Sequence, residues 1–178
     1  MKYKIIYADP PWKYQDKGCN GNCEQHYNTM SIEELKKLPI KDITDDNCVL
    51  FMWATYPMLN EALELIKSWG FKYKTIAFQW IKTTKHGKYF YGLGRWTRGN
   101  TEPCLLAVKG KPKRIRKDVF QLVFSEINGH SKKPNEVRNK IVDLIGDEPR
   151  IELFARERFD GWDCYGDQLS DTIQKYIT

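Results

Sequence analysis

The stretch Ile5-Ile6-Tyr7-Ala8-Asp9-Pro10-Pro11-Trp12 decides the fold of this chain. Its apolar first half is typical of a short buried strand. Pro10 and Pro11 have no backbone N–H to donate to a sheet, so the strand must end directly after Asp9. We therefore expect a carboxylate, a stiff diproline turn and an exposed indole at the carboxyl end of a strand, which is where open α/β sheets bind ligands.

The chemistry that suits this turn is attack by a planar exocyclic amine. The lone pair of an aromatic amino group is delocalised into its ring, so the nitrogen is a poor nucleophile. The carboxylate of Asp9 and the backbone carbonyl of Pro10 can each accept one N–H, which frees the lone pair for attack. Trp12 offers a face on which a base can stack, worth about 1–3 kcal/mol. The alternative is an ordinary turn after a strand, with a structural tryptophan.

Length and charge bound the class of protein. The 178 residues predict one domain, residues 1–178, that can bury a full core. The formal net charge of +6 is compatible with a polyanionic partner. No apolar run approaches the roughly 20 residues of a membrane span, and residues 1–4 lead straight into a strand. We therefore expect no membrane partner, no signal peptide and a cytoplasmic location.

The five cysteines are scattered along the chain, and their number is odd. This usage favours a reducing compartment without a disulfide framework. Cys19, Cys23 and His26 have a spacing that metal ligands can have, but no second ligand pair follows at a suitable distance. We therefore expect no metal site.

Local patterns predict where the first helix and the second strand lie. Ser31 and Glu34 form a capping box that opens a helix, and Pro39 ends it. Cys48 to Trp53 is a continuous apolar run, typical of a strand that is buried on both faces.

The following segments extend this α/β pattern. A helix over residues 58–69, ended by Gly70, precedes a strand at 75–80, which predicts a βαβ crossover and a parallel sheet. Further strands are expected at 102–109, 121–126 and 150–155. Ser131 or Asn135 is expected to cap one more helix before the last of these strands.

Two segments between the expected elements are basic. Residues 83–101 form a loop that combines cations, aromatic rings and glycines, which suits gripping a single strand or a flipped-out base. Residues 109–117 carry a cluster of lysines and arginines. Such a cluster is usually a solvated face, but beside a nucleotide site we expect it to contact nucleic acid.

The string Asp9-Pro10-Pro11-Trp12 resembles the catalytic motif of the DPPW-type adenine-N6 methyltransferases, a family that includes the eukaryotic mRNA m6A writer and bacterial and phage relatives. Matching stretches follow in order from about Tyr3 to Leu169; they include residues 27–30, 49–53, 80–82, 101–105, 131–134, 150–156 and 161–169. The resemblance implies an α/β, Rossmann-like fold that binds S-adenosylmethionine, with a mostly parallel sheet flanked by helices. It also implies a permuted motif order, because the catalytic strand comes first and the cofactor strand near the end.

The resemblance carries roles onto individual residues. The implied catalytic residues are Asp9, Pro10, Pro11 and Trp12. The implied substrate-binding residues are Tyr27, Trp53, Lys82 and Lys109, to which the basic loop adds Arg98. The implied cofactor-binding residues are Ala8, Asp9, Lys109, Glu152, Phe154, Arg156, Asp167 and Gln168. Tyr27 and Trp53 could instead be packing residues, and the asparagine that the family usually has shortly after Arg156 is not evident here.

These patterns together predict an S-adenosylmethionine-dependent enzyme that methylates the N6 amino group of adenine in nucleic acid. DNA is the favoured substrate because the chain is compact, and RNA is the alternative. The rival hypothesis is a non-catalytic, nucleic-acid-binding subunit, which the intact motif disfavours. The expected partners are nucleic acid and either a second copy of the chain or a methyltransferase-like subunit.

Overall fold

One seven-stranded sheet runs through the computed structural model of this chain, which describes residues 2–13, 29–94, 96–127, 132–167, 169 and 173–176. The strands are β1 (Tyr3–Ala8), β2 (Thr44–Trp53), β3 (Lys72–Thr83), β4 (Thr101–Lys109), β5 (Leu122–Glu126), β6 (Arg150–Leu153) and β7 (Asp163–Tyr165). The helices are α1 (Ile32–Lys37), α2 (Ile40–Ile43), α3 (Leu59–Ser68) and α4 (Glu136–Ile145), with 3-10 turns η2 (Tyr56–Met58) and η3 (Ile173–Tyr176).

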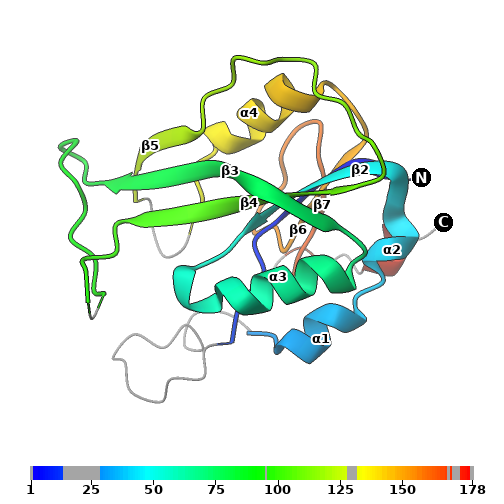
Figure 1. Cartoon of the computed structure of the whole chain (residues 1–178), viewed down its shortest axis with the longest axis horizontal. Coiled ribbons are helices and arrows are strands. Elements are labelled where there is room, and N and C mark those ends of the chain that lie inside the picture. The colour runs from blue at the N-terminus through cyan, green and yellow to red at the C-terminus, as the bar shows by residue number, and fades with distance from the viewer. Residues whose placement is uncertain are drawn as a thin grey trace.

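The sheet has the order β5-β3-β4-β2-β1-β6-β7 and is mostly parallel, as expected. The pairs β1–β2, β1–β6, β3–β5 and β6–β7 are parallel. Strand β4 runs antiparallel to both of its neighbours, β2 and β3. The predicted crossover from β2 through α3 to β3 is present and its two strands run in the same direction, but β4 lies between them (Figure 1).

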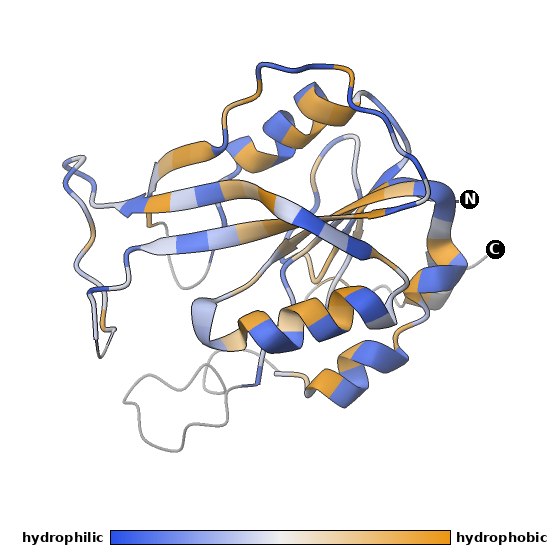
Figure 2. Cartoon of the chain, in the orientation of Figure 1, coloured by the Kyte–Doolittle hydropathy of each residue, from blue (hydrophilic) through white to orange (hydrophobic). Residues whose placement is uncertain are grey.

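Helices cover both faces of the sheet. Successive residues of β2 alternate between two apolar clusters, with Leu50 in the cluster under α1, α2 and α3 and Phe51 in the cluster under α4. Strand β1 alternates in the same way, with Ile6 in the first cluster and Tyr7 in the second. Figure 2 shows hydrophobic and hydrophilic residues alternating along α1, α3 and α4, as one-sided burial of a helix requires. The predicted burial of both faces over residues 48–53 is confirmed, and the strand predicted at residues 5–7 is buried as expected.

Local signals fix the ends of several elements. The capping box is present: Glu34 N–H donates to the Ser31 hydroxyl, and Ser31 N–H donates to the Glu34 carboxylate across 2.8 Å. Gly70 follows α3 with a φ of 86°, a conformation that glycine adopts without strain. Asn135 is the N-cap of α4, but its side chain makes no capping hydrogen bond there. Ser131 lies outside the described residues.

Within the described part of the chain, every helix is too short or too polar to cross a bilayer. Cys48, Cys104 and Cys164 are buried free thiols. Cys19, Cys23 and His26 lie outside the described residues, and no cluster of metal-ligating side chains occurs among those that are described.

Candidate active site

The carboxyl ends of β1 and β6 lie side by side, because the two strands are parallel neighbours in the sheet. Ala8 pairs with Leu153, and Asp9 N–H donates to Leu153 C=O across 3.4 Å. The chain order reverses at this point, because β2 lies on one side of β1 and the much later β6 lies on the other. Open α/β sheets bind ligands outside the carboxyl ends of strands at such a reversal.

The diproline turn holds its carbonyls in defined positions. Trp12 N–H donates to Pro10 C=O across 2.9 Å, and Met30 N–H donates to Pro11 C=O across 2.9 Å. A carbonyl oxygen has two lone pairs, so Pro10 keeps one for a further donor. The Pro10 carbonyl can therefore still accept an N–H beside the carboxylate of Asp9.

The expectation that the Trp12 indole is exposed is wrong, because this side chain is only 5% exposed. Trp12 forms a bridge with Met30 and joins the apolar cluster under α1 to α3, because the chain returns past the diproline turn. Within the described residues, its buried indole N–H has no hydrogen-bond partner. In this conformation Trp12 supports the turn from the core side and does not present a free face for stacking.

A network of partly buried ion pairs connects Asp9 to the carboxyl end of β3. Lys133 Nζ lies 2.9 Å from Asp9 Oδ2 and 3.1 Å from Glu102 Oε1. The other Glu102 oxygen lies 2.8 Å from Lys82 Nζ. Lys133 and Glu102 are nearly buried, so these charges are screened little by water.

The pKa values of the residues in this ion-pair network follow from burial and charge. Burial raises the pKa of Asp9 above its usual value, and the positive charge of Lys133 offsets this only in part. Burial acts to lower the pKa of Lys133, but Asp9 and Glu102 outweigh it, so that pKa is raised. Burial acts to raise the pKa of Glu102, but Lys133 and Lys82 outweigh it, so that pKa is lowered. Asp9 is thus the carboxylate of this network whose negative charge is most easily lost, and Lys133 acts against that loss.

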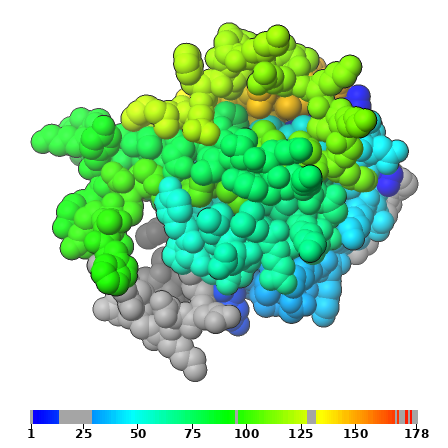
Figure 3. All heavy atoms as spheres, viewed as in Figure 1, coloured from blue at the N-terminus to red at the C-terminus, as the bar shows by residue number. Residues whose placement is uncertain are grey.

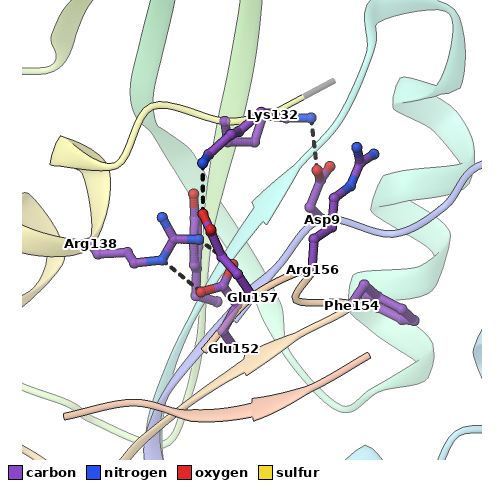
Figure 4. Close-up of a pocket in the computed structure, with 9 residues that line it drawn as sticks. Asp9, Lys132, Arg138, Glu152, Phe154, Arg156 and Glu157 are labelled. Atoms are coloured by element: carbon purple, nitrogen blue, oxygen red, sulfur yellow. Dashed lines mark hydrogen bonds and ion pairs between the residues drawn. The ribbon is translucent and has the colours of Figure 1, made fainter. Parts of the chain in front are cut away.

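A cavity of about 140 Å³ opens beside Asp9 (Figure 4). It is lined by Tyr7, Asp9, Lys132, Lys133, Arg138, Glu152, Phe154, Arg156 and Glu157. Phe154 has a φ of 64°, the one positive value among the described non-glycine residues. Such strain is held at ligand sites more often than elsewhere, and Phe154 directly follows β6 at the same edge as Asp9.

Glu152 lines the cavity, but its carboxylate is held by Arg138. The two carboxylate oxygens accept hydrogen bonds from Arg138 Nη2 at 2.6 Å and Nε at 2.7 Å. Burial raises the pKa of Glu152, and Arg138 offsets this in part. The guanidinium also lies 3.5 Å from the ring centre of Phe159. This bidentate pair joins α4 to β6 and fixes one wall of the cavity.

The structure brings several of the predicted residues to this edge of the sheet. These residues are Ala8, Asp9, Glu152, Phe154 and Arg156. The positive charge of Arg156 acts, like that of Lys133, against the rise in the pKa of Asp9 that burial causes. Figure 4 shows the Arg156 side chain running alongside that of Asp9.

Asp167 is exposed just beyond β7, whose end pairs with the end of β6. Asp167 therefore lies beyond the same edge of the sheet. Tyr27 and Gln168 lie outside the described residues.

Trp53 and Lys109 are not brought to an open position beside Asp9. Trp53 is fully buried and donates to the Tyr7 hydroxyl across 2.6 Å, so a base could reach it only if its neighbours moved. Lys109 pairs with Cys48, four residues before the partner of Ala8 on β2, which is about 13 Å along the strand. The cause is the direction of β4, which carries Lys109 toward the opposite edge of the sheet.

Lys82 and Arg98 belong to the region of the basic loop. Lys82 lies 4.9 Å from the ring centre of Trp80 and pairs with Glu102. Arg98 is exposed and lies 4.7 Å from the ring centre of Tyr91.

Sequence reasoning missed several of the residues that line the cavity, and among them Lys133 is the one that contacts the Asp9 carboxylate. It belongs to the matched string over residues 131–134, which was the one signal that could have identified it.

Comparisons with known proteins match nearly the whole chain to one family. The MT-A70 family profile matches residues 3–168. The type II methyltransferase M.MunI of a Mycoplasma species is 36% identical over 190 residues, which cover 96% of this chain and 79% of that protein. The human N(6)-adenosine-methyltransferase catalytic subunit METTL3 is 28% identical over 173 residues, which cover 94% of this chain but 28% of that protein. An MT-A70-like N(6)-adenosine-methyltransferase of Arabidopsis thaliana is 27% identical, and the match covers 24% of it. The chain thus spans about a quarter of these two eukaryotic relatives.

Proposed function

The chain belongs to the MT-A70 family, and from this premise we propose that it transfers the methyl group of S-adenosylmethionine to the N6 amino group of adenine in nucleic acid. The observation that carries the proposal is the position of Asp9. Its carboxylate lies at the carboxyl end of β1 beside the cavity, accepts a hydrogen bond from Lys133, and has the Pro10 carbonyl next to it in the chain.

The residues of this turn would act by positioning and by accepting hydrogen bonds. The Asp9 carboxylate and the Pro10 carbonyl would each accept one N–H of the adenine amino group, which directs the nitrogen lone pair toward the methyl donor. Fixing the two reactants in one geometry can supply much of the rate. A carboxylate is too weak a base to remove the amino proton first, so N6 loses that proton after the new C–N bond has formed. The cavity walls would exclude water.

The residues present fit the proposed cofactor. When bound, S-adenosylmethionine supplies an electrophilic methyl group on a sulfonium and leaves as S-adenosylhomocysteine. Arg156 offers a cation that suits a carboxylate. Asp9 offers a negative charge that suits a sulfonium, and the strained backbone of Phe154 is typical of a ligand contact. Asp167, beyond the same edge, and Gln168 are proposed as further contacts.

DNA is the substrate that we infer. Identity is higher to the type II methyltransferase than to the N(6)-adenosine-methyltransferases, and the match covers most of the former but only about a quarter of the latter. Type II methyltransferases as a class modify DNA. RNA is the second candidate, since the relatives named for N(6)-adenosine methylation also match nearly all of this chain.

The test is nucleoside mass spectrometry after incubation of the protein with S-adenosylmethionine and separate pools of DNA and RNA that lack adenine methylation. We expect N6-methyladenine in the DNA pool. N6-methyladenosine in the RNA pool alone would overturn the substrate assignment. No product in either pool, together with no S-adenosylmethionine binding by calorimetry, would favour the non-catalytic subunit. Binding without product would indicate that a second copy or a partner subunit is required.

A further inference from the structure

The loop between β3 and β4 carries large apolar side chains that the protein leaves in solvent. Trp96 is 100% exposed, Leu93 88%, Tyr89 70% and Tyr91 68%. A large apolar surface of this kind on a protein marks a binding site more often than not. We call residues 84–100 the finger. Figure 3 shows this green segment standing out from the body of the molecule.

Close backbone contacts give the finger a defined shape. A Cβ atom placed on Gly92 would lie 1.9 Å from Gly99 O, and one placed on Gly94 would lie 2.0 Å from Thr97 O. Only glycine permits such approaches, so the two arms of the finger lie directly against each other near Trp96. Lys82 N–H donates to Asn100 C=O across 2.8 Å and closes the base. The finger therefore holds Trp96 near the end of two backbone segments that pack directly against each other.

The finger rises from the same edge of the sheet as the active site. Strand β3 runs in the same direction as β1, so its carboxyl end at Thr83 and the end of β1 at Ala8 lie at one edge. Lys82 and Glu102 lie at the base of the finger, and the ion pairs through Lys133 connect them to Asp9. A nucleic acid that delivers a base to Asp9 would therefore pass the finger.

The charge of the finger indicates its partner. The segment contains Lys85, Lys88, Arg95 and Arg98 and no aspartate or glutamate. Exposed rings flanked only by cations suit a nucleic acid, since the cations contact phosphates and the rings stack on bases. A protein surface would have to be strongly acidic to match, and a second copy of this basic chain would not be.

We propose that Trp96 enters the base stack of a DNA duplex and fills the gap that a flipped-out adenine leaves. An enzyme that works on a paired base must extrude it and offset the lost stacking. Apolar side chains that wedge between base steps are a known way for proteins to stabilise distorted duplexes. This role deepens the proposed function, on which it rests for its link to methylation, and it requires nothing of Trp12, which is buried.

Fluorescence anisotropy tests the wedge without turnover or cofactor. The probes are a fluorescein-labelled DNA duplex with one abasic site and the intact duplex of the same sequence. We expect the wild-type protein to bind the abasic duplex about tenfold more tightly than the intact duplex, which is the size of one base–aromatic stacking contact. Trp96→Ala should abolish this preference, and Trp96→Phe should keep part of it. Phe120→Ala is the matched control, because Phe120 is 82% exposed but lies outside the finger.

Equal affinity of the wild-type protein for the two duplexes would overturn the inference, and so would a preference that survives Trp96→Ala. A change of oligomeric state on Trp96→Ala, measured by light scattering, would instead assign Trp96 to a contact between protein chains. The assay separates the two proposals. A Trp96-dependent preference in a protein that neither binds S-adenosylmethionine nor methylates DNA or RNA would leave the wedge standing and refute the proposed function.

Discussion

Lys133 Nζ donates to Asp9 Oδ2 across 2.9 Å, and this contact joins residues 124 positions apart in the chain. Asp9 directly follows β1, while Lys133 lies just before α4, so the contact ties the diproline turn to the helix that covers the second apolar cluster. Lys133 also pairs with Glu102 at the start of β4. The charge of Asp9 thus depends on two other segments of the fold.

Replacing Lys133 should shift the acid limb of the pH–activity profile to higher pH. Burial already raises the pKa of Asp9, and Lys133→Met removes the charge that offsets this effect. The ionised form is the active one, so activity falls as the pH drops through this pKa. In the pH profile of kcat/KM, we expect the acid limb of the variant to lie about one to three pH units higher than that of the wild type. Lys140→Met, a change of a half-buried lysine on α4, should keep the wild-type profile. Coinciding profiles for Lys133→Met and wild type would refute the role of Lys133.

Breaking the pair between Arg138 and Glu152 should destabilise the fold. Both side chains are nearly buried, so Glu152→Leu leaves an unmatched guanidinium and should lower the free energy of unfolding by about 3 kcal/mol. The double variant Arg138→Met, Glu152→Leu should cost less than the sum of the two single changes, because it leaves no lone charge. Urea unfolding measures all four proteins, and additive costs would contradict this account.

Two glycines of the finger should respond differently to the same change. Gly92→Ala places a methyl group against the backbone oxygen of Gly99, whereas Gly99→Ala meets nothing within 4 Å. Gly92→Ala should distort the finger and remove the preference for the abasic duplex, while Gly99→Ala should retain this preference. Anisotropy with the probes described above decides, and a Gly92→Ala protein with the wild-type preference would argue against a fixed finger.

The basic segment after β4 should contribute to the salt dependence of DNA binding. Lys113, Arg114 and Lys117 are exposed, whereas Arg116 pairs with Asp118 across 2.7 Å. If the three exposed cations contact phosphates, replacing all of them with alanine should reduce the slope of log affinity against log salt by up to about 3. Arg116→Ala should change it less, and an unchanged slope in the triple variant would assign the segment to a solvated face.

Features that depend on neighbouring residues were predictable from the sequence. The diproline ends β1, the capping box starts α1, Gly70 ends α3, and the apolar run of β2 is buried on both faces. Each of these follows from backbone chemistry or side-chain period within a few residues. The position of Asp9 at the edge of the sheet could therefore be derived before the fold was known.

Features that depend on distant segments were not predictable in this way. Trp12 is buried because the chain returns past the turn at Met30, which no local pattern encodes. Lys109 lies toward the opposite edge because β4 inserts antiparallel between β2 and β3, and a strand pattern does not specify direction. Lys133 becomes a site residue only when the fold brings it to Asp9.

The most direct test of the central claim is the turnover of Asp9→Asn beside its affinity for S-adenosylmethionine. The substitution keeps the shape of the side chain but removes the carboxylate that would accept the amino N–H. We predict that kcat falls at least about 100-fold, the usual size of losing one such polar group at a reacting atom. Calorimetry should show that the variant still binds the cofactor, though more weakly because the negative charge beside the sulfonium is lost, so turnover is compared at saturating S-adenosylmethionine. An Asp9→Asn protein that forms N6-methyladenine at the wild-type rate would contradict the account.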